Sequence, residues 1–385
     1  MTSLRARPHD TLHAILSIPL TSLCMPQHRA PCAHVYASLT PAFILEVLQC
    51  LGLWPDGRLL ALNSFENRVY LVWLDEVVHD DQGEAHASLV LKAYRPGRWS
   101  AEQILEEHSF ARELAEQELP VVVPWNLRRM AHERLRPLSP HDGHAGHALD
   151  LVGDTLLRAG PFLIALWARQ GGRAPEIDRP EVLHWIGRLV ARIHQVGSRV
   201  AFEHREAFRG LDGARQALVR VAALERPMPP SRDQWLGAAG RTLDLAQKRL
   251  NALPAPRLIR VHGDMHAGNV LWTASGPHLV DLDDCRMGPA VTDLWPLLSG
   301  QGEELDSCLA QLLHGYCAIA DLDHSELHWV EVLRSVRLIE HAAWIAARYD
   351  DPAFPRAFPG FAEPDFWDRR RLELEQQCSL LQDHG

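Results

Sequence analysis

Lysine is nearly absent from this sequence. Of its 39 basic residues only Lys92 and Lys248 are lysines, so the other 37 (39 minus 2) are arginines. The net charge of −10 argues against a general nucleic-acid-binding surface, although it is compatible with a local basic pocket for a phosphate-rich ligand. A lysine in such a chain is either there by chance or lies at a position that needs a compact ammonium group and not a forked guanidinium.

Paired cysteines and long apolar segments are also missing. The seven cysteines are odd in number, scattered and without a C-x-x-C pair, which argues against a disulfide framework or a zinc site. They indicate reduced thiols and a cytoplasmic location. No apolar run of about eighteen residues lacks a charge or a proline, so we expect no membrane span. The length of 385 residues, 46% of them hydrophobic, suits a soluble protein of two lobes.

The N-terminal residues loosely imitate a signal peptide, because Arg5 and Arg7 precede a short apolar run. Histidines and an aspartate lie within the charged part, and Pro19 interrupts the apolar part, so secretion is the weaker interpretation. We expect residues 1–35 to be a disordered tail or an overlong start, with Met25 as the alternative initiator.

The predicted secondary structure changes from mainly strands to mainly helices near residue 166. Residues 36–165 carry strand-like runs and two capped helices, whereas residues 166–385 are mainly helical. The expected strands are 59–63, 68–74, 88–94, 121–123, 154–158 and 162–167, and the main expected helices are 41–51, 100–117, 180–196, 231–252 and three more after residue 303. This pattern predicts an α+β, bilobal protein, with a small mixed β-sheet lobe, a mainly helical lobe and a ligand cleft at their junction.

One block, residues 261–295, concentrates polar residues between strand-like pieces. Asp264 and Asn269 are separated by four residues, which is the D-x-x-x-x-N spacing of a kinase catalytic loop. One carboxylate can accept a hydrogen bond from an attacking hydroxyl, and a nearby carboxamide oxygen can reach a phosphate-bound metal. A predicted hairpin over 269–280 would bring Asp281 back beside Asn269. One carboxylate and one amide suffice for Mg²⁺, which prefers oxygen ligands and keeps several waters.

Plainer interpretations of these polar residues exist. The acidic run that starts at Asp281 could cap a helix over 289–298 or form a solvated turn. His262 and His266 have the spacing of a zinc pair on a helix, but neighbouring glycines make a helix doubtful, and His262 fits better as a residue that bonds loop backbone. The histidines of residues 139–147 could bind a metal, although a solvated loop is the more natural interpretation.

Several segments carry a resemblance: HGDMHAGN, LVDLDD and DLW in the block above, and ALNSFENRVY, LKAYRPGRWSAEQILEEHSFA and GGR before it. Over roughly residues 36–380 the chain resembles the aminoglycoside phosphotransferase and choline-kinase-like superfamily, and within it the bacterial stress-response serine/threonine protein kinases. The resemblance implies a protein-kinase-like fold, ATP as co-substrate, Mg²⁺ and a cytoplasmic location.

The resemblance also implies roles for residues of the catalytic block. Asp264 would be the catalytic base, and Asn269 and Asp281 would hold Mg²⁺. Asp293 would bond the catalytic loop from the element that follows. The hinge that meets adenine through its backbone would be Trp167, Ala168 and Arg169.

Further roles fall on the first lobe. Lys92 would pair with the α- and β-phosphates of ATP, and Glu107 on the next helix would pair with Lys92, with Glu106 as the fallback. Ser64, in the turn of ALNSFENRVY, would touch the phosphates. The chain departs here from eukaryotic kinases, because its turn contains no glycine and no G-x-G-x-x-G motif is present. Backbone N–H groups and the Ser64 hydroxyl must then hold the phosphates.

Three functions remain open at this point. The first is a protein serine/threonine kinase; the second is a small-molecule kinase acting on an amino alcohol, a sugar or an aminoglycoside, which would use the same residues. The third is a non-catalytic nucleotide-binding scaffold, disfavoured because the expected catalytic residues are all present. Only eleven residues separate Asp281 from Asp293, which leaves no room for a phosphorylated activation loop. We expect ATP and unidentified proteins as partners of a monomer, and neither nucleic acid nor membrane.

Overall fold

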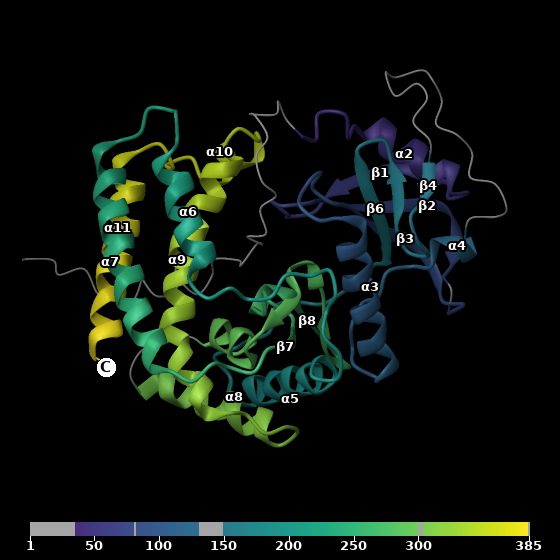
Figure 1. Ribbon diagram of the computed structural model, residues 1–385. Coiled ribbons are helices and arrows are strands. Elements are labelled where there is room, and N and C mark those ends of the chain that lie inside the picture. Colours follow the sequence, from purple (N-terminus) through teal and green to yellow (C-terminus); the bar gives the residue numbers. More distant parts are fainter. Residues whose placement is uncertain (1–34, 81, 131–148, 299–302, 384–385) are drawn as a thin grey trace, which may run out of the picture. The chain divides into compact units, whose positions relative to one another are not determined.

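The computed structural model describes residues 35–80, 82–130, 149–298 and 303–383 (Figure 1). The tail over residues 1–34 and the histidine-rich loop, for which predictions were made, lie outside these ranges. The described residues form two compact units. One contains those of Cys24–Gly171 together with the short segment Asp350–Phe354, and the other contains those of Gly172–Tyr349 and Pro355–Gly385. We call them the sheet unit and the helical unit.

The sheet unit is built on six described strands in the order β1-β2-β3-β6-β5-β4, and every pairing among them is antiparallel. In chain order its elements are α2 (Pro41–Cys50), β1 (Pro55–Ala61), β2 (Arg68–His79), β3 (Ala85–Ala93), α3 (Ala101–Glu116), α4 (Leu127–Met130), β4 (Leu149–Leu151), β5 (Leu157–Ala159) and β6 (Phe162–Ala168). Lys92 lies in the middle of the sheet, with Val69 opposite on β2 and Ala165 opposite on β6.

Local signals set both long helices of this unit. The Thr40 hydroxyl accepts a hydrogen bond from Phe43 N at 3.1 Å at the start of α2. Ser100 and Gln103 form the predicted capping box at the start of α3. Both helices bury an apolar face in the hydrophobic clusters of the sheet unit.

The strand predicted over 121–123 is wrong. Pro120 and Pro124 flank it and lack the N–H groups that a ladder needs, and the structure places only isolated bridges there, including that of Pro124 with Trp167. The strand predicted over 154–158 begins only at Leu157, and the short strand β4 was not predicted.

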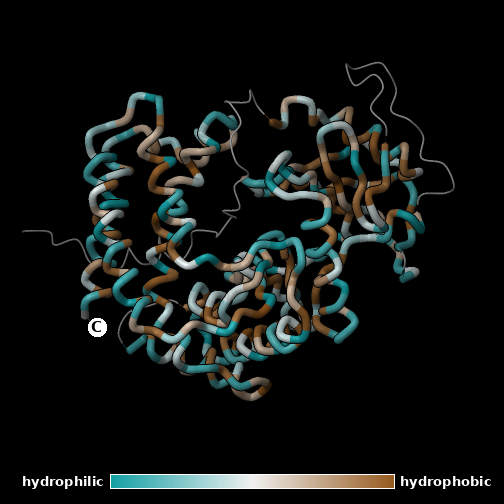
Figure 2. Tube along the Cα trace, viewed as in Figure 1, coloured by the Kyte–Doolittle hydropathy of each residue, from teal (hydrophilic) through white to brown (hydrophobic). Residues whose placement is uncertain are grey.

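The helical unit consists of helices paired along their lengths. They are α5 (Pro180–Gly197), α6 (Asp212–Ala222), α7 (Pro230–Ala252), α8 (Glu303–Cys317), α9 (Val330–Arg348) and α11 (Pro364–Asp383). The short helix α10 (Ala353–Ala357) begins in the sheet-unit segment Asp350–Phe354 and ends in the helical unit. Helix α5 packs on α8, α6 on α9, and α7 on α11. Hydrophobic and hydrophilic residues alternate along these helices in Figure 2, as expected for helices with one buried face. No helix within the described ranges is long and apolar enough to cross a membrane.

The helical unit also holds short elements that carry the polar block. These are β7 (Ile259–Val261), η2 (Ala267–Asn269), β8 (Val270–Thr273), β9 (Gly276–Leu279), η3 (Leu282–Asp284), β10 (Arg286–Gly288), η4 (Ala290–Asp293), η5 (Trp295–Leu297) and η6 (His324–Trp329). β7 pairs with β10, and β8 pairs with β9. The helix considered over 289–298 is absent, and two 3₁₀ turns occupy that stretch instead.

Candidate active site

The predicted hairpin is formed by β8 and β9, and it returns the chain to Asn269. Val270 lies opposite Leu279, and Val280 N donates a hydrogen bond to Asn269 O at 3.1 Å. Asp281 is the next residue, so the backbone places it beside Asn269. Asp281 has the left-handed conformation, with φ of 60° and ψ of 67°, which aspartate tolerates better than most residues. Such conformations gather at functional sites, where the surroundings hold them.

Asp264 is buried, and only part of its carboxylate is bonded. Its backbone oxygen accepts a hydrogen bond from Asn269 Nδ2 at 2.9 Å, and its Oδ2 lies 3.4 Å from His266 Nε2. Its Oδ1 is buried and has no hydrogen-bond partner among the described residues. Leaving a buried carboxylate oxygen without a partner costs stability, so its presence indicates a functional role. A substrate hydroxyl is the kind of donor that would satisfy it.

Asp293 binds the backbone of the loop just before Asp264, which is the contact that was predicted for it. Its carboxylate accepts hydrogen bonds from His262 N at 2.6 Å and Gly263 N at 2.8 Å, and His194 Nε2 donates to it at 3.1 Å. Burial alone would raise the pKa of Asp293, but the hydrogen bond and charge of His194, with smaller effects of His262 and Gly263, bring the pKa below its usual value. Asp293 therefore stays ionised and fixes the backbone just before Asp264.

The two histidines do not form the zinc pair. His262 Nε2 donates to Val280 O at 3.1 Å, so its Nδ1 is free to accept from Asp264 N at 3.3 Å. His262 thus bonds loop backbone, as we expected. His266 Nδ1 accepts from Gly268 N at 2.9 Å. Over the described part of the chain, no group of three or more His, Cys, Asp or Glu side chains could hold a metal.

A hard divalent cation nevertheless fits Asn269 and Asp281. Donation of the Asn269 amide nitrogen to Asp264 O fixes that carboxamide and reserves its oxygen for another partner. An amide oxygen and a carboxylate form an all-oxygen donor pair of the kind that Mg²⁺ uses when water and phosphate complete its shell. The chain would then supply only two ligands.

In the sheet unit, Lys92 and Glu107 form the expected ion pair. Lys92 Nζ lies 3.8 Å from Glu107 Oε1, and both side chains are buried. Tyr94 OH donates to Glu107 Oε1 at 3.2 Å, and the Lys92 ammonium lies 4.8 Å from the centre of the Tyr94 ring. Glu107 lies on the buried face of α3, whereas the fallback Glu106 is only half-buried.

The remaining predicted nucleotide contacts also lie in the sheet unit. Ser64 is half-buried in the turn between β1 and β2. Trp167 and Ala168 end β6, and Arg169 follows them. The Trp167 ring lies 5.9 Å from Lys92 Nζ, so this side chain belongs to the surroundings of the lysine.

Three charged residues near the loop that holds Asp264 were not predicted, and two of them, Arg337 and Glu340, are buried. Arg337 and Glu340 lie on α9, and Arg286 lies on β10, where its Nη2 donates to Gly263 O at 3.0 Å. Burial, and then Arg286, lowers the pKa of Arg337 to about 10, whereas Asp264 and another carboxylate act in the opposite direction. Burial raises the pKa of Glu340 to about 7. An arginine and a glutamate on a helix suggest an exposed face in sequence, so only tertiary packing identifies them.

A separate pocket of about 230 Å³ opens elsewhere in the helical unit. It is lined by Arg173, Glu176, Arg179, Glu181, Val182, Trp185 and Trp272. Trp272 of β8 lines it, but Asp264, Asn269 and Asp281 do not, and its charges are largely paired with one another.

Comparison with known proteins gives a consistent result. Residues 58–330 match the model of the phosphotransferase enzyme family. The chain is 34% identical over 358 residues to a protein of Escherichia coli (strain K12) named stress response kinase A, covering 91% of this chain and 96% of that protein. It is 33% identical over 357 residues to a protein of Salmonella typhimurium named serine/threonine protein kinase RdoA, covering 91% and 95%.

Solved structures of similar fold are more distant in sequence. A microcompartment-associated aminopropanol kinase superposes with a TM-score of 0.59 at 18% identity, over 88% of this chain and 98% of that one. An amicoumacin kinase, solved with AMP-PNP and Ca²⁺, gives 0.57 at 19% identity, over 84% and 90%. These likenesses bear out the α+β, kinase-like fold class.

Proposed function

This chain belongs to the phosphotransferase enzyme family, and we propose that it is a cytoplasmic, Mg²⁺- and ATP-dependent serine/threonine protein kinase with a role in stress response. The observation that carries the proposed chemistry is the state of Asp264. Its loop is fixed by Asp293 and Asn269, while one buried carboxylate oxygen has no partner among the described residues. The near full-length similarity to a protein named as a serine/threonine protein kinase favours a protein acceptor.

The transfer step follows from these residues. The acceptor hydroxyl donates a hydrogen bond to Asp264, which takes its proton as the hydroxyl oxygen bonds to the γ-phosphorus. The bond from that phosphorus to the bridging oxygen breaks, and ADP leaves with the electron pair. Mg²⁺ bound to Asn269 and Asp281 would neutralise charge on the phosphates. Lys92, oriented by Glu107 and Tyr94, would pair with the α- and β-phosphates.

A small-molecule kinase is the second candidate, because the solved structures of similar fold include kinases named for aminopropanol and amicoumacin. The test incubates purified protein and γ-labelled ATP with two acceptor sets. One set is a heat-treated cell lysate fractionated by size, and the other is a pool of amino alcohols, sugars and aminoglycosides. Asp264→Asn serves as the inactive control.

The protein-kinase proposal expects label on serine or threonine of protein fractions with the wild type only. Loss of the base should cost about 10²–10⁴-fold in rate and leave ATP binding nearly intact. Label confined to the small-molecule pool would transfer the assignment to the second candidate. ATP binding without labelling of either set would indicate the scaffold function, and an Asp264→Asn variant with more than about a tenth of wild-type turnover would contradict the base assignment.

A further inference from the structure

A short segment from far along the chain belongs to the sheet unit. After α9 ends, the five residues Asp350–Phe354 are part of the sheet unit, and the chain returns to the helical unit at Pro355. Asp351 is the buried centre of this segment, and Phe354 packs edge-on against Phe65 with ring centres 6.2 Å apart. The segment therefore meets the turn that joins β1 to β2.

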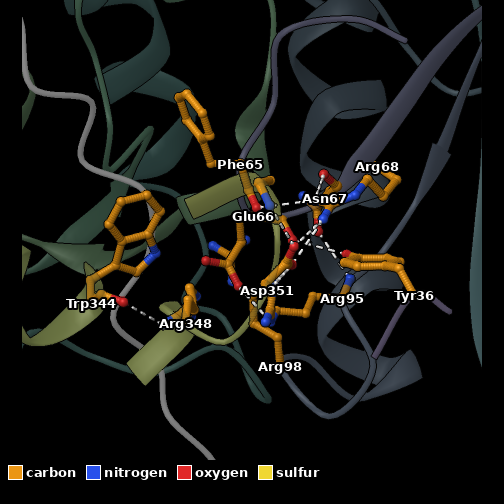
Figure 3. A network of polar contacts seen from close by, with 11 residues as sticks. Tyr36, Phe65, Glu66, Asn67, Arg68, Arg95, Arg98, Trp344, Arg348 and Asp351 are labelled. Carbon is orange, nitrogen blue, oxygen red and sulfur yellow. Dashed lines mark hydrogen bonds and ion pairs between the residues drawn. The ribbon is translucent and has the colours of Figure 1, made fainter. Parts of the chain in front are cut away.

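Asp351 binds two arginines of the sheet unit (Figure 3). Arg68 Nη2 donates to Asp351 Oδ1 at 2.7 Å and to Oδ2 at 2.8 Å, and Arg95 Nη1 donates to Oδ2 at 3.2 Å. Ala353 N donates to Oδ1 at 3.2 Å at the start of α10. Both carboxylate oxygens are thus occupied by charge-assisted hydrogen bonds, which hold geometry more strictly than neutral ones.

The same two arginines hold the turn itself. Arg68 Nη1 donates to Phe65 O at 3.3 Å and to Asn67 O at 3.4 Å. Arg95 N donates to Asn67 Oδ1 at 3.1 Å. Asp351 therefore acts on the turn indirectly, through Arg68 and Arg95.

Glu66 completes the attachment of the turn. Its backbone oxygen accepts a hydrogen bond from Tyr36 OH at 2.9 Å, and its buried carboxylate lies 3.8 Å from Arg95 Nε and 3.9 Å from Arg98 Nε. The network thus places three arginines against two carboxylates, those of Glu66 and Asp351. Removing the charge of Asp351 would deprive Arg68 of its bidentate partner and Arg95 of one of its two carboxylate contacts.

This arrangement answers a question raised by the sequence. A turn that grips phosphates through backbone N–H groups usually relies on glycine to bring the backbone close to the ligand. The turn Ser64–Asn67 has no glycine, so its conformation must be held by other contacts. Phe65, Glu66 and Asn67 each have a backbone oxygen that accepts a hydrogen bond within the network.

We propose that Asp351 is a positioning residue for the nucleotide: through Arg68 and Arg95 it fixes the glycine-free turn Ser64–Asn67 in the conformation that binds the triphosphate of ATP. This proposal rests on the proposed function, in which Ser64 and the backbone of the turn meet the phosphates. A purely structural ion pair would change stability alone. A positioning role predicts a loss that depends on the phosphates of the ligand.

The test compares Asp351→Asn with a matched control. Asp154→Asn removes a carboxylate from another aspartate–arginine pair of the sheet unit, where Arg128 Nε lies 2.7 Å from Asp154 Oδ1 but both side chains are exposed. Calorimetric titration measures the affinity of each protein for MgATP and for adenosine, and thermal melting reports folding. We expect Asp351→Asn to bind MgATP about tenfold more weakly, with unchanged affinity for adenosine, and the control to match the wild type.

Three results would overturn the inference while leaving the proposed function intact. They are MgATP affinity unchanged in Asp351→Asn, a loss equal for MgATP and adenosine, and the same loss in the control. If Asp351→Asn does not fold, Asp351→Glu keeps the charge but changes the bidentate geometry, and the same selective loss is expected at smaller size; equal affinities would again refute the proposal. Failure of the wild type and the control to bind MgATP at all would instead refute the proposed function.

Discussion

Replacing Asp293 by Asn should uncouple the catalytic loop from its support. The buried carboxylate accepts three hydrogen bonds, from His262 N, Gly263 N and His194 Nε2. A carboxamide can accept through its oxygen, but its NH₂ group would face a donor and leave it unsatisfied. Hydrogen bonds to charged groups contribute about 1.5–3 kcal/mol each, so losing the equivalent of two costs about 3–6 kcal/mol.

That loss is a large share of the roughly 5–15 kcal/mol that stabilises a typical protein, so the variant should fold with a lower midpoint of urea unfolding. Turnover should fall about 10²-fold even in the folded fraction, because small displacements of a catalytic group have effects of that size. The variant should also be less sensitive to acid. The pKa of Asp293 is lower in the folded chain than in the unfolded one, so its stabilisation is complete above the unfolded pKa and disappears as pH falls through the folded pKa.

Urea unfolding monitored by circular dichroism measures the loss of stability, and turnover measured without urea measures the loss of activity. Asp244→Asn, an exposed aspartate on α7, is the matched control and should behave as wild type. The refuting result is a decrease of less than about 1 kcal/mol in the free energy of unfolding of Asp293→Asn, with turnover intact. The hydrogen bonds of Asp293 would then neither support the loop nor position the base.

Other substitutions test separate parts of the site. Lys92→Arg keeps the charge and should melt normally but lose ATP turnover, because a guanidinium does not fit between Glu107 and phosphates; a variant with normal turnover would remove the proposed role of Lys92. Asp281→Ala should abolish the Mg²⁺ dependence of ATP binding in nucleotide titrations, and an unchanged dependence would move the metal ligand elsewhere. Burial raises the pKa of Glu340 to about 7, so the ionised carboxylate destabilises the folded chain at a pH above the unfolded pKa. Glu340→Gln should therefore raise the free energy of unfolding by up to about 3 kcal/mol at pH 8 and change it little at pH 5. Thermal melting that shows the same effect of the substitution at both pH values would contradict this.

Local features of the fold and the site were predictable from sequence. Thr40 and Ser100 predicted the starts of α2 and α3, because an N-cap depends on residues within one turn. The hairpin over β8 and β9 followed from two short strands and a turn. The spacing of Asp264 and Asn269 predicted their loop, in which the Asn269 side chain reaches back over four residues to the backbone oxygen of Asp264.

Only the tertiary structure decided which distant residues meet. Nothing near Asp351 in sequence indicates that it belongs to the sheet unit and binds Arg68, which precedes it by 283 positions. Arg337 and Glu340 are charged residues on a helix, where local pattern favours solvent, but the packing of α9 buries them. Propensity, capping and turn chemistry act over a few residues and can be read along the chain, whereas burial and ion pairing depend on what the folded chain brings to the other side of a contact.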